Sequence, residues 1–347
     1  MEFVNKAIFD SVAGAPFARQ DLSSVITLQD GEPRPVSSMA MQVEAKQEIH
    51  QWREAKTFAA GSGQESYAEG ALPNTPGQNT VSMQNTTCRV GYTAQVTEEM
   101  MAVWRHGGVW MLDNAQTTRV IQEALDFEVA LATEAALNGI EYQHESGDSS
   151  NPQGTGVWPG GQTDGLIKWC VANGSATYAS GSSSGPAAQM SEQIIKNAAR
   201  TAARRYPRKQ PDTLLMSTGL REDFSSFVGS GAGRAILQVV KDGPNGTAGL
   251  VGGSEVAYYN TGYSVLKLET APYFSALRNQ NLPGNGDAIV LYNKSDVKHA
   301  QLIPLSTTPL AQIDTSLKTI VRASFAQEHR NVLGAQAILN VASAFTG

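Results

Sequence analysis

The chain has 347 residues, a formal net charge of −6, a hydrophobic content of 41% and a charged content of 17%. This length suffices for about two domains with cores of their own, and the acidic balance argues against a dedicated nucleic-acid binder, which would carry a basic face. The charged content lies below the roughly 25% typical of soluble proteins. The surface must therefore be rich in Ser, Thr, Asn, Gln and Gly, which favours a protein that meets copies of itself.

Cysteine usage and hydropathy bear on the compartment. Cys88 and Cys170 are the only cysteines, too few for a disulfide framework or a zinc site, so we expect two buried free thiols. The N-terminal segment mixes Glu2, Lys6 and Asp10 among its apolar residues, which argues against a signal peptide. No stretch reaches the roughly 18 apolar residues needed to cross a bilayer. We expect a protein that is made and kept in a cytosol, with no membrane partner.

The first third of the chain predicts an arm followed by a ribbon. Residues 1–38 carry scattered apolar side chains without periodicity, which indicates an extended arm that needs a partner surface. Alternation then begins at Met39 and returns over 81–96, which predicts the two strands of a long ribbon. Residues 60–79, rich in Gly, Pro, Ser and Asn, are the expected tip. The apolar parity switches between Met83 and Cys88, which predicts a bulge or a strong twist.

The ribbon is also the first candidate for an intersubunit contact. An isolated two-stranded ribbon is marginal in water and its edges invite pairing, so we expect it to lie on a neighbouring subunit. A hairpin folded back on its own domain is the open alternative. An exposed Trp and Phe beside a charge are typical interface anchors. Trp52, Arg53 and Phe58 are therefore the candidate contact residues on the ribbon.

A short helix over 97–105 and a long helix over 113–138 are expected next. Asp113 is a suitable N-cap, Gln116 follows three residues later as in a capping box, and Gly139 supplies a left-handed position beyond the last turn. The apolar side chains of the long helix fall on one broad arc, made of Val120, Ile121, Ala124, Leu125, Phe127, Leu131, Ala132 and Ala135.

The remainder reads as a mixed α/β domain followed by a tail of strands. Two helices are expected at 186–205 and 221–228. Strands are expected at 213–216, 236–240, 255–259, 264–268 and 288–292, and again in the tail at 317–325 and within 332–345. The sequence thus predicts an α+β protein with a second domain over roughly 160–300.

A serine esterase is the main enzymatic alternative. Gly181–Gly185 satisfies G-x-S-x-G around Ser183, a His-Gly-Gly triplet starts at His106, and Asp287 and His329 follow in the order that such a triad needs. The preceding segment, NGSATYASG, is not the apolar strand that a nucleophile elbow requires. We therefore expect no catalytic residue and no enzyme activity.

Other chemistry is equally sparse. The five histidines are dispersed, with no pair at metal-ligand spacing, so we expect no metal and no cofactor. One basic cluster consists of Arg200, Arg204, Arg205, Arg208 and Lys209. It fits nonspecific contact with nucleic acid, a solvated helix end, or an intersubunit salt bridge. Its central pair, Arg204 and Arg205, is a second candidate for an intersubunit contact.

Short local matches accompany this order of elements. They are Val96-Thr97-Glu98-Glu99, Ala124–Glu128, Thr163–Trp169, Gly262–Val265, Pro309–Ala311 and the ending Glu328–Asn340 with Asn331 and Gly334. With these motifs the chain resembles the major capsid proteins of tailed phages that share the Hong Kong phage (HK-ninety-seven) shell fold. Within them it is most similar to the subgroup of the coliphage SU-ten head protein.

The resemblance implies an α+β phage major-capsid fold with a defined domain order. The implied parts are an N-terminal arm (1–38), a peripheral-domain strand with the extended loop (39–96), a peripheral domain (97–159) on a spine helix (113–138), an axial domain (160–300) and a return to the peripheral domain (301–347). It also implies a protein that self-assembles into the icosahedral head of a double-stranded DNA phage, inside the host bacterial cytoplasm.

The implied partners are copies of the chain in pentamers and hexamers, with portal, scaffolding and decoration proteins as further candidates and packaged double-stranded DNA in nonspecific proximity. The family has no active-site residues to transfer. Some relatives cross-link a loop lysine to an asparagine of a neighbour, but Lys46 and Lys56 both lie away from the tip of the ribbon, so we do not expect that chemistry. An encapsulin-like compartment with the same fold is the open alternative.

Overall fold

The computed structural model describes residues 25–27, 32–55, 69, 80–99, 110–113, 118–121, 124–150, 162–182, 185–205, 209–230, 258–279, 282, 286–310, 315–331 and 334–343. The chain divides into two compact units. Unit 1 comprises residues 1–31, 93–134 and 309–320, and unit 2 comprises residues 32–92, 135–308 and 321–347. Among the helices described, none is both long and apolar enough to span a membrane.

Unit 1 contains a three-stranded sheet in the order β1-β6-β7, formed by β1 (Val25–Thr27), β6 (Trp110–Asp113) and β7 (Thr118–Ile121). β1 runs parallel to β6, and β6 antiparallel to β7. The helix predicted from Asp113 therefore begins later, because β6 and β7 occupy its first third. Three of the four residues in Thr118–Ile121 are β-branched, and such residues favour strands over helices.

The long helix is α4, and it spans Ala124–Ser146. The expected end at Asn138 was also wrong, since the helix continues through Gly139. A Cβ atom at Gly139 would lie 2.8 Å from Cγ1 of Val90, so glycine here permits close approach of α4 to a strand rather than ending the helix. Beside this contact lies a small core formed by Cys88, Val90, Leu137, Ile140, Leu305, Ala323 and Phe325.

A four-stranded sheet runs in the order β2-β14-β15-β5. Its strands are β2 (Met41–Glu44), β5 (Cys88–Thr97), β14 (Val297–Pro309) and β15 (Ser316–His329). β2 pairs in parallel with β14 and follows the short helix α2 (Pro35–Met39). β14 was not anticipated, because Pro304 and Pro309 interrupt its pattern and proline argues against a strand inside a sheet.

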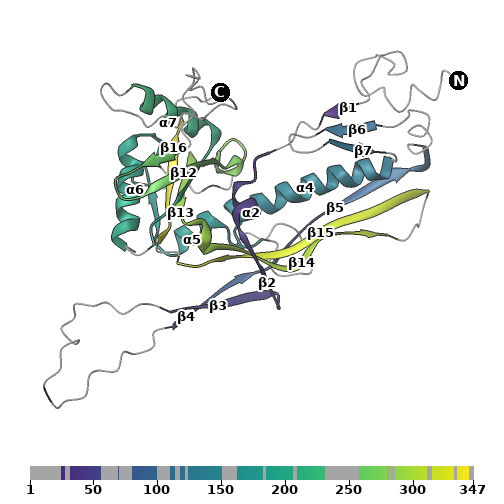
Figure 1. Cartoon of the computed structure of the whole chain (residues 1–347), viewed down its shortest axis with the longest axis horizontal. Coiled ribbons are helices and arrows are strands. Elements are labelled where there is room, and N and C mark those ends of the chain that lie inside the picture. The colour runs from purple at the N-terminus through teal and green to yellow at the C-terminus, as the bar shows by residue number, and fades with distance from the viewer. Residues whose placement is uncertain are drawn as a thin grey trace, which may run out of the picture. The chain divides into compact units, whose positions relative to one another are not determined.

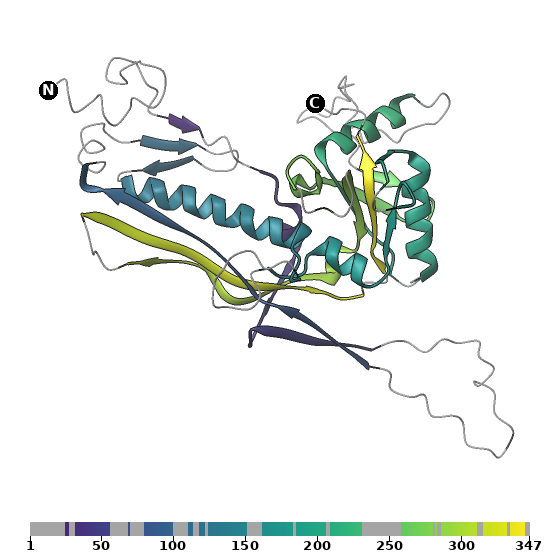
Figure 2. The same cartoon turned by 180° about the vertical axis from the view of Figure 1, so that it is seen from behind.

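The predicted ribbon is confirmed over part of its length. The predicted segments Met41–Glu44 and Cys88–Val96 lie instead in the four-stranded sheet, within β2 and β5. β3 (Ile49–Ala55) and β4 (Thr80–Thr86) pair antiparallel, from Ile49 opposite Thr86 to Ala55 opposite Thr80, and lie side by side in both views (Figure 2). The parity switch is confirmed as well. The less exposed side chains have odd numbers in β4 and even numbers in most of β5, and Thr87 separates the two strands. At this break the chain leaves the ribbon for the four-stranded sheet. Of the predicted tip, only Glu69 is described.

The mixed α/β part of unit 2 is a seven-stranded sheet in the order β11-β12-β10-β13-β16-β8, with β9 also on β16. Its strands are β8 (Ala176–Tyr178), β9 (Ala188–Gln189), β10 (Thr213–Met216), β11 (Tyr258–Asn260), β12 (Val265–Thr270), β13 (Asp287–Tyr292) and β16 (Gln336–Ala342). The predicted strands at 213–216, 264–268 and 288–292 are confirmed. The prediction at 236–240 lies outside the described residues.

Helices cover both faces of this sheet (Figure 1). On one face, Ile195 and Ala198 of α6 (Glu192–Arg205) pack against Leu214. On the other, Leu166 of α5 (Leu166–Ala172) packs with Leu215. α6 starts six residues later than expected because β9 occupies the beginning of the predicted helix. α7 (Thr218–Ser230) contains the helix expected at 221–228, and both cysteines are buried and free, as predicted.

We predict that Gly139 and Val90 are energetically coupled. A Gly139→Ala substitution gains roughly 1 kcal/mol of helix propensity but forces the new methyl group onto Val90, at a cost of about 1–3 kcal/mol. Adding Val90→Ala removes the obstruction. A double-mutant cycle by urea unfolding should therefore give a favourable coupling of at least about 1 kcal/mol. Additive effects of the two substitutions would contradict this packing.

Candidate assembly interface

The ribbon is fastened to the rest of unit 2 by a buried asparagine at its base. Asn85 of β4 is 3% exposed. Its Nδ2 donates to the carbonyl oxygens of Gln327 (2.7 Å) and Asp164 (3.1 Å), and its Oδ1 accepts from the Asp164 backbone N–H at 3.0 Å. One side chain thus joins β4 to the end of β15 and to the segment before α5. Because a buried amide satisfies these backbone groups, the base of the ribbon has a fixed position on unit 2.

Trp52 belongs to the same attachment. It is 7% exposed, lies beside Met83, and its ring centroid is 5.5 Å from that of Trp169 on α5. The premise that Trp52 is exposed in the single subunit was therefore wrong. Trp52 and Met83 face each other across the ribbon, and this face turns toward Trp169. Replacing Trp52 by Ala should consequently destabilise the subunit itself.

The adjacent residue has the opposite orientation. Arg53 is exposed, as expected for the other face of an alternating strand. Phe58, the third ribbon candidate, lies outside the described residues. The intersubunit role of Arg53 stays a prediction.

Further polar contacts reinforce the base of the ribbon. His50 Nε2 lies 2.9 Å from Glu328 Oε2, and Glu328 is also paired with Arg330. Four residues further along β3, Glu54 Oε1 accepts from the Asn331 backbone N–H at 2.9 Å. These contacts link β3 to the turn that follows β15.

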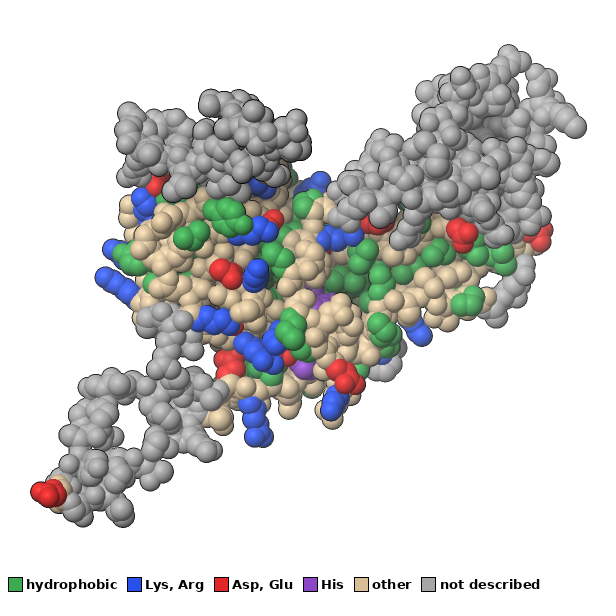
Figure 3. Space-filling model, in the orientation of Figure 1, with side chains coloured by type: hydrophobic (Ala, Val, Ile, Leu, Met, Phe, Trp, Pro, Cys, Tyr) green, Lys and Arg blue, Asp and Glu red, His purple; other side chains and the backbone are tan. Residues whose placement is uncertain are grey.

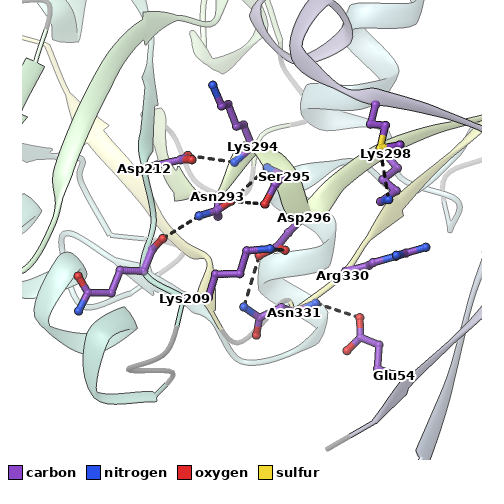
Figure 4. A network of polar contacts seen from close by, with 12 residues as sticks. Glu54, Lys209, Asp212, Asn293, Lys294, Ser295, Asp296, Lys298, Arg330 and Asn331 are labelled. Atoms are coloured by element: carbon purple, nitrogen blue, oxygen red, sulfur yellow. Dashed lines mark hydrogen bonds and ion pairs between the residues drawn. The ribbon is translucent and has the colours of Figure 1, made fainter.

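The same turn is held from its other side (Figure 4). Asn331 has a left-handed backbone (φ 55°), and its Nδ2 donates to Asp296 Oδ2 at 3.4 Å. Asp296 lies in the 3-10 helix η3 (Lys294–Asp296) and is paired with Lys209. Burial raises the pKa of Asp296, and the hydrogen bond and charge of Lys209 oppose that rise. Lys209, one member of the predicted basic cluster, is therefore engaged within the subunit.

The rest of the basic cluster lies at the end of α6. Arg205 donates to the Gly174 carbonyl oxygen (2.8 Å) and to Ser175 Oγ (3.1 Å), so it ties α6 to the turn after α5. Arg200 and Arg204 are exposed, and Arg208 lies outside the described residues. On the face drawn in Figure 3, Lys and Arg side chains are interspersed with Asp, Glu and uncharged groups rather than forming one basic surface.

The residues of the esterase alternative are not assembled by the described part of the chain. Ser183 and His106 lie outside it. Asp287 accepts from Ser217 Oγ and, at 2.8 Å, from the Ala276 N–H, so both of its carboxyl oxygens are engaged. His329 is buried, and within the described residues neither of its ring nitrogens has a hydrogen-bond partner.

The structure brings together two histidines that the sequence left apart. His144 Nε2 lies 2.7 Å from His299 Nδ1, both residues are buried, and both rings contact Phe325. The pKa of His144 is lowered by burial and by the charge of His299, and burial lowers that of His299 to about 4. Within the described residues no three His, Cys, Asp or Glu side chains form a metal-binding group. The pair was missed because the expected helix ended before His144.

The comparisons with known proteins agree with this architecture. The family model described as SU10 major capsid protein matches residues 7–342. The chain therefore belongs to the SU10 major capsid protein family. It is a tailed-phage major capsid protein, a non-enzymatic component of the virion that forms the head shell.

Solved structures show the same fold at low sequence identity. A structure from Mycobacterium phage Bobi has a TM-score of 0.52 and 13% identity, covering 96% of both chains. The capsid of an empty GTA particle has a TM-score of 0.57 and 14% identity, covering 97% of this chain and 100% of the other. The holo-SrpI encapsulin complex from Synechococcus elongatus PCC 7942 has a TM-score of 0.55 and 10% identity, covering 94% of each. A search of curated protein sequences found no significant match.

We predict that Asn85→Ala destabilises the subunit by about 2–4 kcal/mol, because it leaves buried backbone groups of Asp164 and Gln327 without partners. Urea unfolding measures the loss, and Ser82→Ala, at an exposed position of the same strand, should change stability by no more than about 0.5 kcal/mol. Equal effects of the two substitutions would show that the amide does not anchor the ribbon.

We also predict a loss of stability in acid caused by the buried histidines. Burial lowers the pKa of His329 from 6.5 to about 4, so the folded state binds fewer protons than the unfolded state. This contribution, roughly 3 kcal/mol, is complete above pH 6.5 and disappears as the pH falls toward about 4. Urea unfolding across this window should show a shallower pH dependence for His329→Leu than for the natural chain. Parallel profiles would refute the assignment.

Proposed function

We propose that copies of this chain assemble through the β3–β4 ribbon, which each subunit lays on a neighbour, to form pentamers and hexamers of an icosahedral shell. One observation carries the proposal. In the described part of the chain β3 and β4 pair only with each other, while their base is held by Asn85 and Trp52. A two-stranded ribbon with open edges is marginal alone and readily pairs with another chain.

The alternation of the ribbon gives it an inner and an outer face. The inner face carries Trp52 and Met83, which meet Trp169. The outer face carries exposed side chains on both strands, namely Ile49, Gln51, Arg53, Ser82 and Gln84. Arg53 contributes the positive charge of this face and is suited to a charge-assisted hydrogen bond with a carboxylate of the neighbour. Arg204, exposed on α6, is proposed as a second contact, with Phe58 and Arg205 as further candidates.

The proposed domain roles follow the order of elements. Residues 1–38 serve as the arm, 39–96 as a peripheral strand and extended loop, and 97–159 as the peripheral domain, whose helix is now bounded as Ala124–Ser146. Residues 160–300 form the axial domain that meets its copies around five- and six-fold centres, and 301–347 return to the peripheral domain. Many modest contacts suffice in a closed shell, because several neighbours must separate together before a subunit leaves.

Packaged double-stranded DNA is proposed as a nonspecific neighbour only. The chain is acidic, with a net charge of −6, which limits phosphate binding. Portal, scaffolding and decoration proteins are proposed as further partners. An encapsulin-like compartment would enclose an enzyme instead of DNA. The likeness to the Synechococcus elongatus structure concerns the fold alone and does not distinguish the two roles. Purified shells that contain DNA support the phage role, and shells that contain an enzyme and no DNA support the compartment.

We predict that Arg53→Glu impairs assembly without unfolding the subunit. Loss of one charge-assisted hydrogen bond, about 1.5–3 kcal/mol per contact, weakens each contact at least about tenfold. Electron microscopy and sedimentation should show fewer closed shells at the same protein concentration, with an unchanged urea midpoint. Lys294→Glu, an exposed charge reversal outside the ribbon, is the matched control. Normal shells from Arg53→Glu would remove the outer face from the interface.

A further inference from the structure

Three carboxyl groups of unit 2 meet where the chain enters α2. Glu141 and Glu145 lie one turn apart on α4, and both residues are fully buried, at 0% exposure. Glu32 immediately precedes the α2 segment, and its side chain is 21% exposed. Two adjacent buried carboxylates are costly unless each negative charge is compensated.

Both carboxyl oxygens of Glu141 accept hydrogen bonds from α2. Its Oε1 accepts from the Val36 N–H at 2.7 Å, and its Oε2 accepts from the Ser37 N–H at 2.8 Å. One turn earlier on α4, Asn138 Oδ1 accepts from Arg34 Nε at 2.9 Å. Because both oxygens of Glu141 act as acceptors, its carboxylate form suits this contact.

Glu145 is only half satisfied as a carboxylate. Its Oε2 accepts from the Tyr273 N–H at 2.9 Å, but within the described residues its buried Oε1 has no hydrogen-bond donor. The group that it does meet is the carboxyl of Glu141. A protonated Glu145 can donate to that carboxylate, and this single proton satisfies Oε1 and leaves the pair with one negative charge instead of two.

Within the described residues, the nearby cations Arg278 and Arg34 have partners outside the pair. Arg278 is paired with Glu32, and Tyr273 of η2 (Pro272–Phe274) faces Glu32 and Glu145. Tyr292 of β13 contributes a buried hydroxyl without a partner in the described residues. Burial raises the pKa of Tyr292, and the nearby carboxylates raise it further, so it remains neutral. Arg34 is held by Asn138, and the neutral His144 neighbours Glu145 along α4.

We propose that Glu141 and Glu145 share one proton and act as a proton-dependent latch for α2. With the proton in place, Glu145 donates to Glu141, and Glu141 holds the Val36 and Ser37 amides. Without it, two negative charges one turn apart repel each other in a buried site, and the hold on α2 weakens. The latch acts near the start of unit 2, which begins at Glu32.

The expected pH dependence of the stability that Glu145 contributes is opposite in sign to that of the buried histidines. Burial raises the pKa of Glu145 well above 4.5, and the charge of Glu141 raises it further. The folded state therefore binds this proton more tightly than the unfolded state. Its stabilising contribution is complete below the ordinary pKa of a glutamic acid and is lost as the pH rises through the raised pKa. The latch is closed in acid and opens in alkali.

Amide hydrogen exchange of the full-length chain between pH 6 and pH 9 tests the latch. Corrected for intrinsic exchange rates, the protection of Val36 and Ser37 should fall by up to about tenfold per pH unit once the proton leaves. Glu145→Gln imitates the protonated acid, since the new amide group donates to Glu141 and its oxygen accepts from Tyr273. In this variant the protection of the Val36 and Ser37 amides should therefore stay constant with pH. Glu44→Gln, at an exposed position, should behave as the natural chain. Constant protection in the natural chain, or an equal fall in Glu145→Gln, overturns the proposal.

A second measurement needs no substitution. Infrared spectra of the natural chain should contain the band of a protonated carboxyl group at pH 6, and this band should disappear over the pH range in which α2 loses protection. Absence of the band at pH 6 shows that the pair holds no proton and also overturns the proposal.

Discussion

The hydrogen bonds of Asn85 are the interaction on which the proposed assembly depends. A two-stranded ribbon is marginally stable in water, so its direction must be set by the contacts that hold its base. Asn85 holds it through backbone groups of two distant segments, and Trp52 adds an apolar contact with α5. The result is a ribbon whose inner face is satisfied within the subunit and whose outer face and edges are available to a neighbour. The Asn85 side chain thus stabilises the subunit and also sets the direction of the ribbon that we propose for assembly.

Buried titratable groups then limit the pH range of unit 2 from both sides. His144, His299 and His329 are neutral in the folded state, so acid opposes folding. Glu145 retains a proton in the folded state, so alkali opposes it. Both effects arise from the same cause, which is burial of ionisable groups on the C-terminal half of α4, on β14 and on β15. The subunit is therefore expected to be most stable between these two pH limits.

Sequence periodicity predicted the strands better than the helices. β4, β5, β10 and β13 were found because apolar side chains alternate or run continuously, and the parity switch at Thr87 was visible in the sequence itself. The long helix was misplaced because Asp113 and Gly139 look like capping residues. Asp113 instead ends a strand, and Gly139 serves close packing against Val90. β14 was missed because its prolines argue against a strand, although tertiary pairing with β2 overrides them.

The candidate contacts were less accessible from the sequence. The Trp52 premise failed because its partner, Trp169, lies 117 positions away in a helix that local patterns do not place beside β3. The anchoring role of Asn85 could not be predicted from local sequence patterns, since its partner Gln327 is 242 positions distant. The shell function came from short motifs together with the order of elements, which the family match then confirmed. Local patterns determine elements, whereas contacts between distant segments determine which side chains remain free for a neighbour.

The most direct test of the central claim compares hydrogen exchange of β3 and β4 in unassembled subunits and in closed shells. If each ribbon lies on a neighbouring subunit, the amides of Ile49–Ala55 and Thr80–Thr86 that face the open edges should gain protection on assembly, and the core strand Thr213–Met216 should remain unchanged. Ribbon amides that exchange equally fast in both states would show that the ribbon is not an assembly contact.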